Sequence, residues 1–176
     1  MEKNIFTQID PYKLEGENFF ADIGKEWMLV SAKSDISGRA NMMTASWGCM
    51  GILWNKNIVN IYVRPSRYTY NYLANNDYFT LNFLEDGNDN TYSFCGTKSG
   101  KDYDKVAETG LIPVRFSDYL YGFDKSKYIF LCKKIYSQPM SIDCFSDQES
   151  GKKLYPNDDV HTMFVAEIEK IYKKNS

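Results

Sequence analysis

Short apolar runs separated by turn residues fill most of this 176-residue sequence and limit its possible folds more than any other feature. In several runs apolar and polar residues alternate with the period of two that indicates a half-buried strand, most plainly at Phe79, Leu81 and Phe83. The runs that we predict as strands are WMLVSA (27–32), NMMTASWG (41–48), GIL (51–53), IVNIYV (58–63), FTLNFL (79–84), YIFLCKKIY (128–136), MSIDCF (140–145) and HTMFVAEIEKIY (161–172).

Few helical segments interrupt these runs. SRYTYNYLANND (66–77) starts at Ser66, a good N-cap residue, and KDYDKVAETG (101–110) ends at Gly110, which suits the position after a helix. Because strands and helices do not alternate, a doubly wound sheet is disfavoured. The pattern predicts a mainly β protein, an antiparallel barrel, in one domain covering residues 1–176.

Turns and irregularities are also predicted from the sequence. WNKN (54–57) indicates a tight hairpin connection, and KSDISGR (33–39) is rich in turn residues. In the last strand the apolar spacing departs from strict alternation. A bulge or bend is therefore predicted within the run that contains Met163, Val165, Ile168 and Ile171.

The composition argues against several classes of function. The apolar fraction of 43% and the charged fraction of 25% are ordinary for a globular domain, and the aromatic fraction of 16% suits a strand-rich fold. A formal charge of −2 and a pI near 5.5 leave no basic stripe for nucleic acid. No apolar stretch approaches the about 20 residues of a membrane span, and the N-terminal residues lack the apolar core of a signal peptide.

The cysteines indicate a reducing compartment. The four thiols are widely spaced, with no C-x-x-C pair, and no secretion signal precedes them. We therefore expect reduced cysteines in a cytoplasmic protein. A zinc site is not expected, because the sequence holds a single histidine to complete one.

The stretch RPSRYTY (64–70) directly follows a strand that we expect to be buried. A helix that starts here would direct its free N–H groups toward an anion. Arg64 and Arg67 can add forked hydrogen bonds to phosphate oxygens, and the hydroxyls of Ser66 and Thr69 can complete the shell. The alternative is an N-cap serine beside two solvated arginines.

Two further stretches contain polar residues in suggestive places. In NMMTASWG, Thr44 and Ser46 interrupt an apolar strand before Trp47, so its backbone can lie along a flat ligand with the indole as a wall; a half-buried strand with polar residues in solvent is the alternative. FCGTKSGKDYDK (94–105) resembles a P-loop, but its G-x-x-x-G-K spacing is one residue short and Asp102 stands where Ser or Thr is needed. We therefore exclude a nucleoside triphosphatase.

Two remaining features are weaker. A Ser99-Gly100 turn that opens a short helix can close over the edge of a ligand and bring Lys105 near it. His161, the only histidine, heads the last strand just after Asp158 and Asp159. A neighbouring carboxylate can raise the pKa of this imidazole toward the physiological range, although a structural role is the alternative.

The order of these stretches is more specific than any one of them. N-x-M-T-A-S-W-G, then R-P-S-R-Y-T-Y, F-T-L-N, C-G-T-K-S-G-K-D-Y-D-K and a late H-T-x-F-V-A-E-I resemble the flavin reductase-like family, and within it the flavoredoxin branch. The resemblance covers roughly residues 20–172, and its most specific parts are R-P-S-R-Y-T and S-G-x-x-x-D-K.

That resemblance implies a fold, a cofactor and a site. The expected fold is an FMN-binding split barrel, antiparallel with Greek-key connections, in a homodimer that holds FMN near the subunit interface. The residues expected along the isoalloxazine are Thr44, Ala45, Ser46 and Trp47. Those expected on the phosphate are Arg64, Ser66, Arg67 and Thr69, and those expected close to the flavin are Asn82, Ser99, Gly100 and Lys105.

The implied function is that of an FMN-dependent NAD(P)H oxidoreductase, in which His161 meets the nicotinamide or substrate. Many family members carry Gly-Asp-His before the last strand, whereas this chain has Asp159-Val160-His161. The change favours the alternative of a flavoredoxin-like electron carrier reduced by a protein partner. A barrel without flavin is the third possibility, and it predicts a colourless protein.

Overall fold

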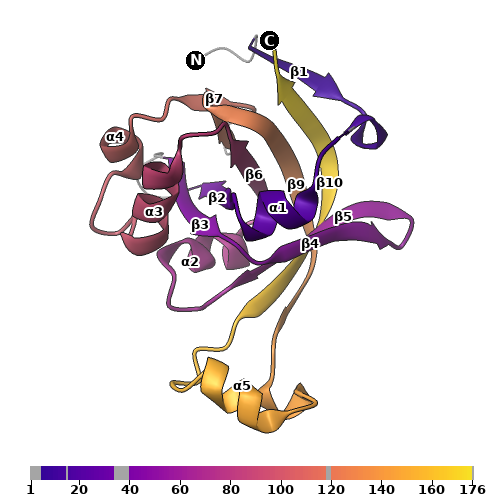
Figure 1. Cartoon of the computed structure of the whole chain (residues 1–176), viewed down its shortest axis with the longest axis vertical. Helices are drawn as coiled ribbons and strands as arrows, with labels where there is room; N and C mark the ends of the chain where they lie inside the picture. The colour runs from indigo at the N-terminus through magenta and orange to yellow at the C-terminus, as the bar shows by residue number, and fades with distance from the viewer. Residues whose placement is uncertain (1–4, 15, 34–39, 118–119, 176) are drawn as a thin grey trace.

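A computed structural model of the chain describes residues 5–14, 16–33, 40–117 and 120–175 (Figure 1). One antiparallel sheet has the strand order β3-β2-β6-β9-β10-β5-β4, with β1 paired to β10, and a small second sheet pairs β7 with β8. The bounds are β1 (Phe6–Ile9), β2 (Met28–Lys33), β3 (Ala40–Ala45), β4 (Gly48–Leu53), β5 (Lys56–Val63), β6 (Tyr78–Leu84), β7 (Pro113–Arg115), β8 (Tyr121–Phe123), β9 (Ser126–Pro139) and β10 (Thr162–Lys174).

The main sheet curls on itself. β3 and β4 stand at opposite ends of the strand order, yet only Ser46 and Trp47 separate them in the chain. A flat sheet cannot meet both conditions, so its two ends must approach each other as in a barrel. Gly48 lies at this corner and permits the close approach of β5, because a Cβ there would lie 2.7 Å from the carbonyl oxygen of Asn60. The predicted mainly β, antiparallel barrel is confirmed.

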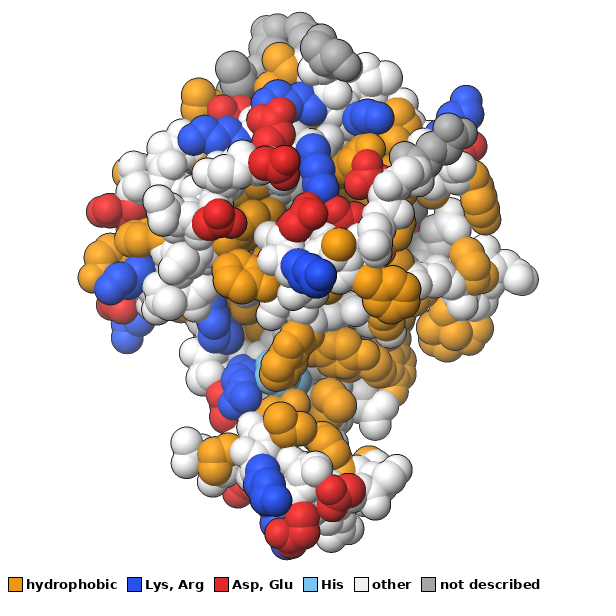
Figure 2. Space-filling model, viewed as in Figure 1, with side chains coloured by type: hydrophobic (Ala, Val, Ile, Leu, Met, Phe, Trp, Pro, Cys, Tyr) orange, Lys and Arg blue, Asp and Glu red, His pale blue; other side chains and the backbone are white. Residues whose placement is uncertain are grey.

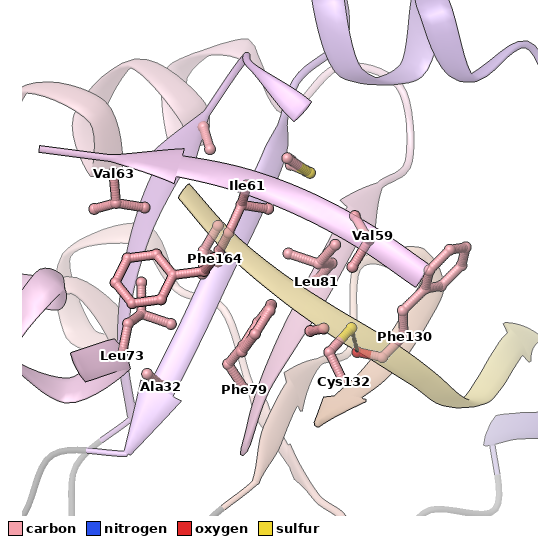
Figure 3. Close-up of a cluster of buried hydrophobic side chains, with 14 of the residues drawn as sticks. Ala32, Val59, Ile61, Val63, Leu73, Phe79, Leu81, Phe130, Cys132 and Phe164 are labelled. Carbon is pink, nitrogen blue, oxygen red and sulfur yellow. Dashed lines mark hydrogen bonds between the residues drawn. The ribbon is translucent and has the colours of Figure 1, made fainter. Parts of the chain in front are cut away.

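The main core fills the inside of this curled sheet (Figure 3). Strand β5 shows how the sequence specifies it, since Val59, Ile61 and Val63 alternate with more exposed residues and are each 0% exposed. Phe79 of β6 and Phe130 of β9 point into the same space. Burying an aliphatic or aromatic side chain of this kind stabilises the fold by about 1.5–3 kcal/mol.

The described residues also form five helices, four of them beside the barrel and one on the arm described below (Figure 1). They are α1 (Phe19–Gly24), α2 (Tyr68–Asn75), α3 (Asp89–Thr97), α4 (Lys105–Thr109) and α5 (Gln148–Leu154), with 3₁₀ turns η2 (Pro11–Lys13) and η3 (Ile142–Cys144). Helices α2, α3 and α4 gather on the side of β3, at the left of Figure 1. No helix in the described residues has the length and apolar character to cross a membrane.

Strands β9 and β10 extend beyond the barrel as an arm (residues 137–163), at the bottom of Figure 1. The arm carries η3 and α5 between the two strand ends. Residues 140–145, predicted as a strand, instead form η3, and that prediction is wrong. The side chain of Ser141 accepts a hydrogen bond from the N–H of Asp143, a local turn that competes with strand pairing.

The predicted irregularity in the last strand is confirmed, because the β9–β10 register shifts between Val165 and Ala166 and again between Ile168 and Lys170. The hairpin at 54–57 is also confirmed. Trp54 and Asn55 have φ values of +50° and +58°, as a tight two-residue connection requires. Of the turn-rich segment 33–39, residues 34–39 lie outside the described residues.

Both predicted helices form, but they are shorter than predicted. Helix α2 begins at Tyr68 rather than near Ser66, because the hydroxyl of Ser66 bonds the carboxylate of Asp159 and caps nothing. Helix α4 begins only at Lys105, where Asp104 is the N-cap. Gly110 ends α4 with φ +65°, as predicted. The four cysteines are free thiols.

Candidate functional site

Two adjoining cavities lie where β3 meets α2, α3 and the end of β5. We call the first the strand lobe, with a volume of about 170 Å³, and the second the polar lobe, with a volume of about 220 Å³. Met43 and Arg67 line both. The strand lobe is also lined by Thr44, Ala45, Ser46, Trp47, Tyr62, Arg64 and His161, and the polar lobe by Ser66, Tyr68, Thr69, Gly96, Thr97, Lys98, Ser99, Gly100 and Lys105.

The polar lobe holds two cations that share one carbonyl group. Lys105 is 4% exposed, and its ammonium donates to the carbonyl oxygens of Met42 and Cys95, each at 2.9 Å. The guanidinium of Arg67 donates to the same Cys95 oxygen at 3.5 Å. Among the described residues, neither cation forms an ion pair with a carboxylate. Two like charges so placed favour an anion between or beside them.

Burial changes the acidity of both cations. It lowers the pKa of Lys105 to about 8, with a smaller contribution from the positive charge of Arg67. Lys105 is therefore protonated, and positively charged, in most molecules at pH 7. Burial also lowers the pKa of Arg67, but a guanidinium remains charged at any physiological pH. The lobe is thus positive where a ligand would enter.

The Ser99-Gly100 turn packs directly against the base of the polar lobe. A Cβ on Gly100 would lie 2.1 Å from Oδ1 of Asn41, so a side chain there would have to displace that of Asn41. The amide of Asn41 in turn donates to the hydroxyl of Thr69 at 2.9 Å. Because Thr69 accepts this bond, its own hydroxyl proton is left for another acceptor. These contacts hold the Ser99-Gly100 turn, β3 and α2 together around the polar lobe.

The strand lobe combines backbone, indole and imidazole. Trp47 is 51% exposed, and its ring lies 4.9 Å from that of His161, centroid to centroid. Thr44 is half-buried and donates its hydroxyl to the carbonyl of Tyr92 at 2.6 Å, which fixes β3 against α3. In Figure 2 the histidine, pale blue, lies among hydrophobic side chains at the junction of barrel and arm.

The acidity of His161 differs from the prediction. Burial, with a smaller contribution from the guanidinium of Arg64, lowers the pKa of His161 to about 4, and the carboxylate of Asp159 only partly opposes this. The predicted rise in pKa is therefore wrong. The reason is that His161 is 7% exposed and faces a cation as well as an anion. The imidazole is neutral at pH 7.

Arg64 and Ser66 have partners within the chain. Asp159 accepts from the N–H of Ser66 at 3.3 Å and from its hydroxyl at 2.5 Å, and Arg64 Nη1 lies 3.9 Å from the same carboxylate. These two predicted phosphate ligands thus already contact an anion. Sequence reasoning missed Asp159 and Tyr155 as site residues. Their only signal was proximity in sequence to the sole histidine.

Asn82 is not part of either lobe. It is 0% exposed within β6, and its amide donates to the carbonyl of Leu29 and to the hydroxyl of Thr80. Ser126 donates to its side-chain oxygen at 3.5 Å. Its hydrogen-bonding groups are therefore satisfied inside the sheet, and its predicted position close to a flavin stays a prediction that neither lobe supports. The other twelve predicted site residues all line one or both lobes.

Two larger and more apolar cavities adjoin the strand lobe. One, of about 710 Å³, lies between α1 and β4 and shares Ser46, Trp47 and Tyr62 with it. The other, of about 550 Å³, lies at the base of the arm and shares Tyr62. Phe20, on the rim of the first, is 94% exposed. The strand lobe thus opens beside a large apolar surface.

The fold and the cavities together define a curled antiparallel barrel with a positive pocket beside an aromatic wall. The sequence profile of the Flavin reductase like domain matches residues 20–176, and the chain belongs to this flavin-binding family. No curated protein sequence matches the chain with significance.

Solved structures with the same fold include flavoredoxins and a flavin oxidoreductase. Flavoredoxin from Methanosarcina acetivorans has a TM-score of 0.67 at 20% identity over 85% of this chain and 69% of that one. Flavoredoxin of Desulfovibrio vulgaris has a TM-score of 0.65 at 20% identity, covering 93% and 76%. An NADH:FAD oxidoreductase of Streptomyces globisporus has a TM-score of 0.64 at 14% identity, covering 94% and 85%. The fold is thus the split barrel of flavin reductase-like proteins.

The residues present fit a flavin nucleotide. Small-molecule sites typically occupy about 300–1,000 Å³, a range that the two lobes reach only together. The unpaired cations of the polar lobe suit a phosphate, and the backbone of residues 44–47 with the Trp47 ring suits a flat heterocycle. An elongated ligand with a ring at one end and an anion at the other matches this division.

Proposed function

We propose that this protein binds FMN and passes electrons from NAD(P)H through it to an acceptor. The observation that carries the proposal is the pair of cations in the polar lobe, Arg67 and Lys105, which have no carboxylate partner among the described residues. Bound FMN would supply the hydride and electron chemistry for which side chains are unsuited. The protein's contribution is to bind, to orient and to adjust charge.

Each part of the site then has a role. Arg67 and the hydroxyl of Thr69 hold the phosphate, and the Ser99-Gly100 turn closes over the ligand. Residues 44–47 and the ring of Trp47 hold the flat ring system, and the ammonium of Lys105 adds positive charge to the polar lobe beside Arg67. Because Asp159 already holds Arg64 and Ser66, we assign the phosphate mainly to Arg67.

A second function is favoured by a different observation. The apolar cavity between α1 and β4, with the 94% exposed Phe20 on its rim, offers an apolar contact for a protein partner beside the strand lobe. In this alternative the protein is a flavoredoxin-like carrier that a redox protein reduces. The Asp159-Val160-His161 sequence, in place of the family's Gly-Asp-His, supports the same alternative.

A second copy of the chain is the partner we expect in either case. Trp47, which lines the strand lobe just before β4, is 51% exposed, and Ile52 and Trp54 are 63% and 64% exposed at the far end of β4 and in its turn. Apolar residues exposed in one neighbourhood mark an interface more often than a solvated surface. A homodimer would cover them and shield the flavin from one side.

The absorbance spectrum of the purified protein, recorded anaerobically with FMN and then with NADH or NADPH, tests the proposal. We expect a flavin spectrum that bleaches with one of the two nucleotides. A flavin spectrum that persists with both would refute nicotinamide dependence and favour the protein-fed carrier. No binding of added FMN would overturn both functions.

A further inference from the structure

His161 lies between the rings of Tyr155 and Trp47, a more constrained position than lining a cavity requires. The hydroxyl of Tyr155 lies 2.8 Å from Nδ1 of His161, and the two rings meet edge to face with centroids 5.5 Å apart. Trp47 contacts the imidazole as well, at 4.9 Å. Tyr155 and His161 are 6% and 7% exposed, so this hydrogen bond is shielded from water.

Arg64 holds the backbone on both sides of Tyr155 in the sequence. The guanidinium of Arg64 donates to the carbonyls of Leu154, at 3.4 Å, and Asp159, at 3.5 Å, and it also lies over the Tyr155 ring, 5.1 Å from its centroid. The Asp159 carboxylate is anchored in turn on Ser66. The end of β5 thereby fixes the residues that precede and follow Tyr155.

The chemistry of this pair decides which imidazole nitrogen carries the proton. A neutral imidazole has one donor and one acceptor nitrogen, and His161 is neutral at pH 7 because burial and Arg64 lower its pKa to about 4. A phenol donates hydrogen bonds better than it accepts them, and a cation over its ring weakens the oxygen as an acceptor further. The Tyr155 hydroxyl therefore donates to Nδ1, and the imidazole proton resides on Nε2.

Among the described residues, the His161 side chain makes no other hydrogen bond, and its backbone oxygen accepts from the N–H of Met140. The Nε2–H group is thus available to a ligand in the strand lobe, which His161 lines. The N–H of a neutral imidazole is too weak an acid to act as a general acid at pH 7, but it can select and orient a ligand by hydrogen bonding to an acceptor oxygen.

We propose that Tyr155 is a positioning residue that holds His161 as the Nε2–H tautomer, so that the strand lobe presents a neutral N–H donor to a ligand bearing a carbonyl or carboxamide oxygen. The ligand class rests on the proposed function, since a flavin ring and a nicotinamide both carry such oxygens. The tautomer does not rest on it.

The single histidine makes this directly measurable. In ¹⁵N-labelled protein at pH 7, without flavin or nucleotide, long-range proton–nitrogen correlations should show Nδ1 unprotonated and Nε2 protonated. Tyr155→Phe keeps the ring under Arg64 and removes only the hydroxyl, and the ratio of the two tautomers should fall about tenfold. Tyr128→Phe, which removes a hydroxyl bonded to Glu17 at 2.7 Å, is the matched control and should leave the histidine signals unchanged.

A protonated Nδ1 in the wild-type protein would overturn the proposal, and this test stands even if Tyr155→Phe fails to fold. An unchanged tautomer ratio in a folded Tyr155→Phe variant would overturn it as well. Addition of FMN and then NAD⁺ tests the ligand class, because we expect the Nε2 signal to shift with one of them. A Nε2 signal that neither compound moves would refute the ligand class, and absent FMN binding would show separately that the proposed function had failed.

Discussion

Arg64 and Arg67 belong to the same seven-residue stretch, yet the two arginines have opposite surroundings. Arg64 faces the arm, where Asp159 balances its charge and Tyr155 packs beneath it. Arg67 faces the polar lobe, where its neighbouring charge is the like-charged ammonium of Lys105. The comparison teaches that a cation already paired with a carboxylate stabilises the fold. A cation without such a partner favours the binding of a ligand anion.

The same contrast extends to the two lobes. The strand lobe holds a neutral imidazole and an exposed indole, which suit an uncharged ring. The polar lobe holds charge and hydroxyls, which suit a phosphate. Because β3 lines both, one extended ligand can contact both kinds of surface at once.

The largest expected effect separates the two arginines. Arg67→Ala should weaken FMN binding by about 100-fold, because charge-assisted hydrogen bonds to a phosphate are lost, and should change riboflavin binding little. Arg64→Ala is the matched control and should weaken FMN binding by less than about threefold, since Asp159 already balances the charge of Arg64. Fluorescence titrations with both flavins measure this. Equal losses in the two variants would mean that Arg64 shares the phosphate after all.

A smaller effect, on stability, should follow from adding a side chain at the Ser99-Gly100 turn. Gly100→Ala should lower the free energy of unfolding by about 2 kcal/mol, because the new Cβ displaces the Asn41 side chain and breaks its bond to Thr69. FMN affinity should fall with it. Gly24→Ala, where a Cβ would meet nothing within 4 Å, is the control for thermal and denaturant unfolding. A Gly100→Ala variant as stable as wild type would contradict this packing.

The smallest expected effect is the pH dependence of stability that His161, at the base of the arm, contributes. The pKa of His161 is about 4 in the folded protein, against 6.5 for a fully solvated histidine, so the unfolded chain binds more protons between these values. Stability should therefore fall as the pH drops from 7 to 5, by up to about 1.8 kcal/mol from this group. Denaturant unfolding of wild type and His161→Gln at both pH values isolates the contribution. A pH dependence that persists unchanged in His161→Gln would rule it out.

The sequence predicted much of the barrel because short-range alternation decides which face of a strand is buried. It also predicted that residues 44–47, Arg67, Thr69, Ser99, Gly100 and Lys105 would meet around one site, although their role there stays a prediction. It did not predict the partners of Arg64 and Ser66. Asp159 lies more than ninety residues away, and its approach depends on how the arm folds back.

Two other differences arise from tertiary contacts. Asn82 looks like a ligand-binding polar residue in an apolar strand, but bonds to neighbouring strands satisfy it inside the sheet. The pKa of His161 could not be inferred from the two preceding aspartates, because burial and the cation of Arg64 outweigh them. Both depend on contacts between distant segments, which a linear pattern does not contain.

Parallel equilibrium titrations of the wild-type protein with FMN and with riboflavin test most directly whether the polar lobe is a phosphate site. The two ligands share the ring system and differ only in the phosphate. We predict that FMN binds about 100-fold more tightly, in line with the loss expected for Arg67→Ala. Equal affinities would contradict the assignment, because the unpaired cations of Arg67 and Lys105 would then serve something other than the flavin phosphate.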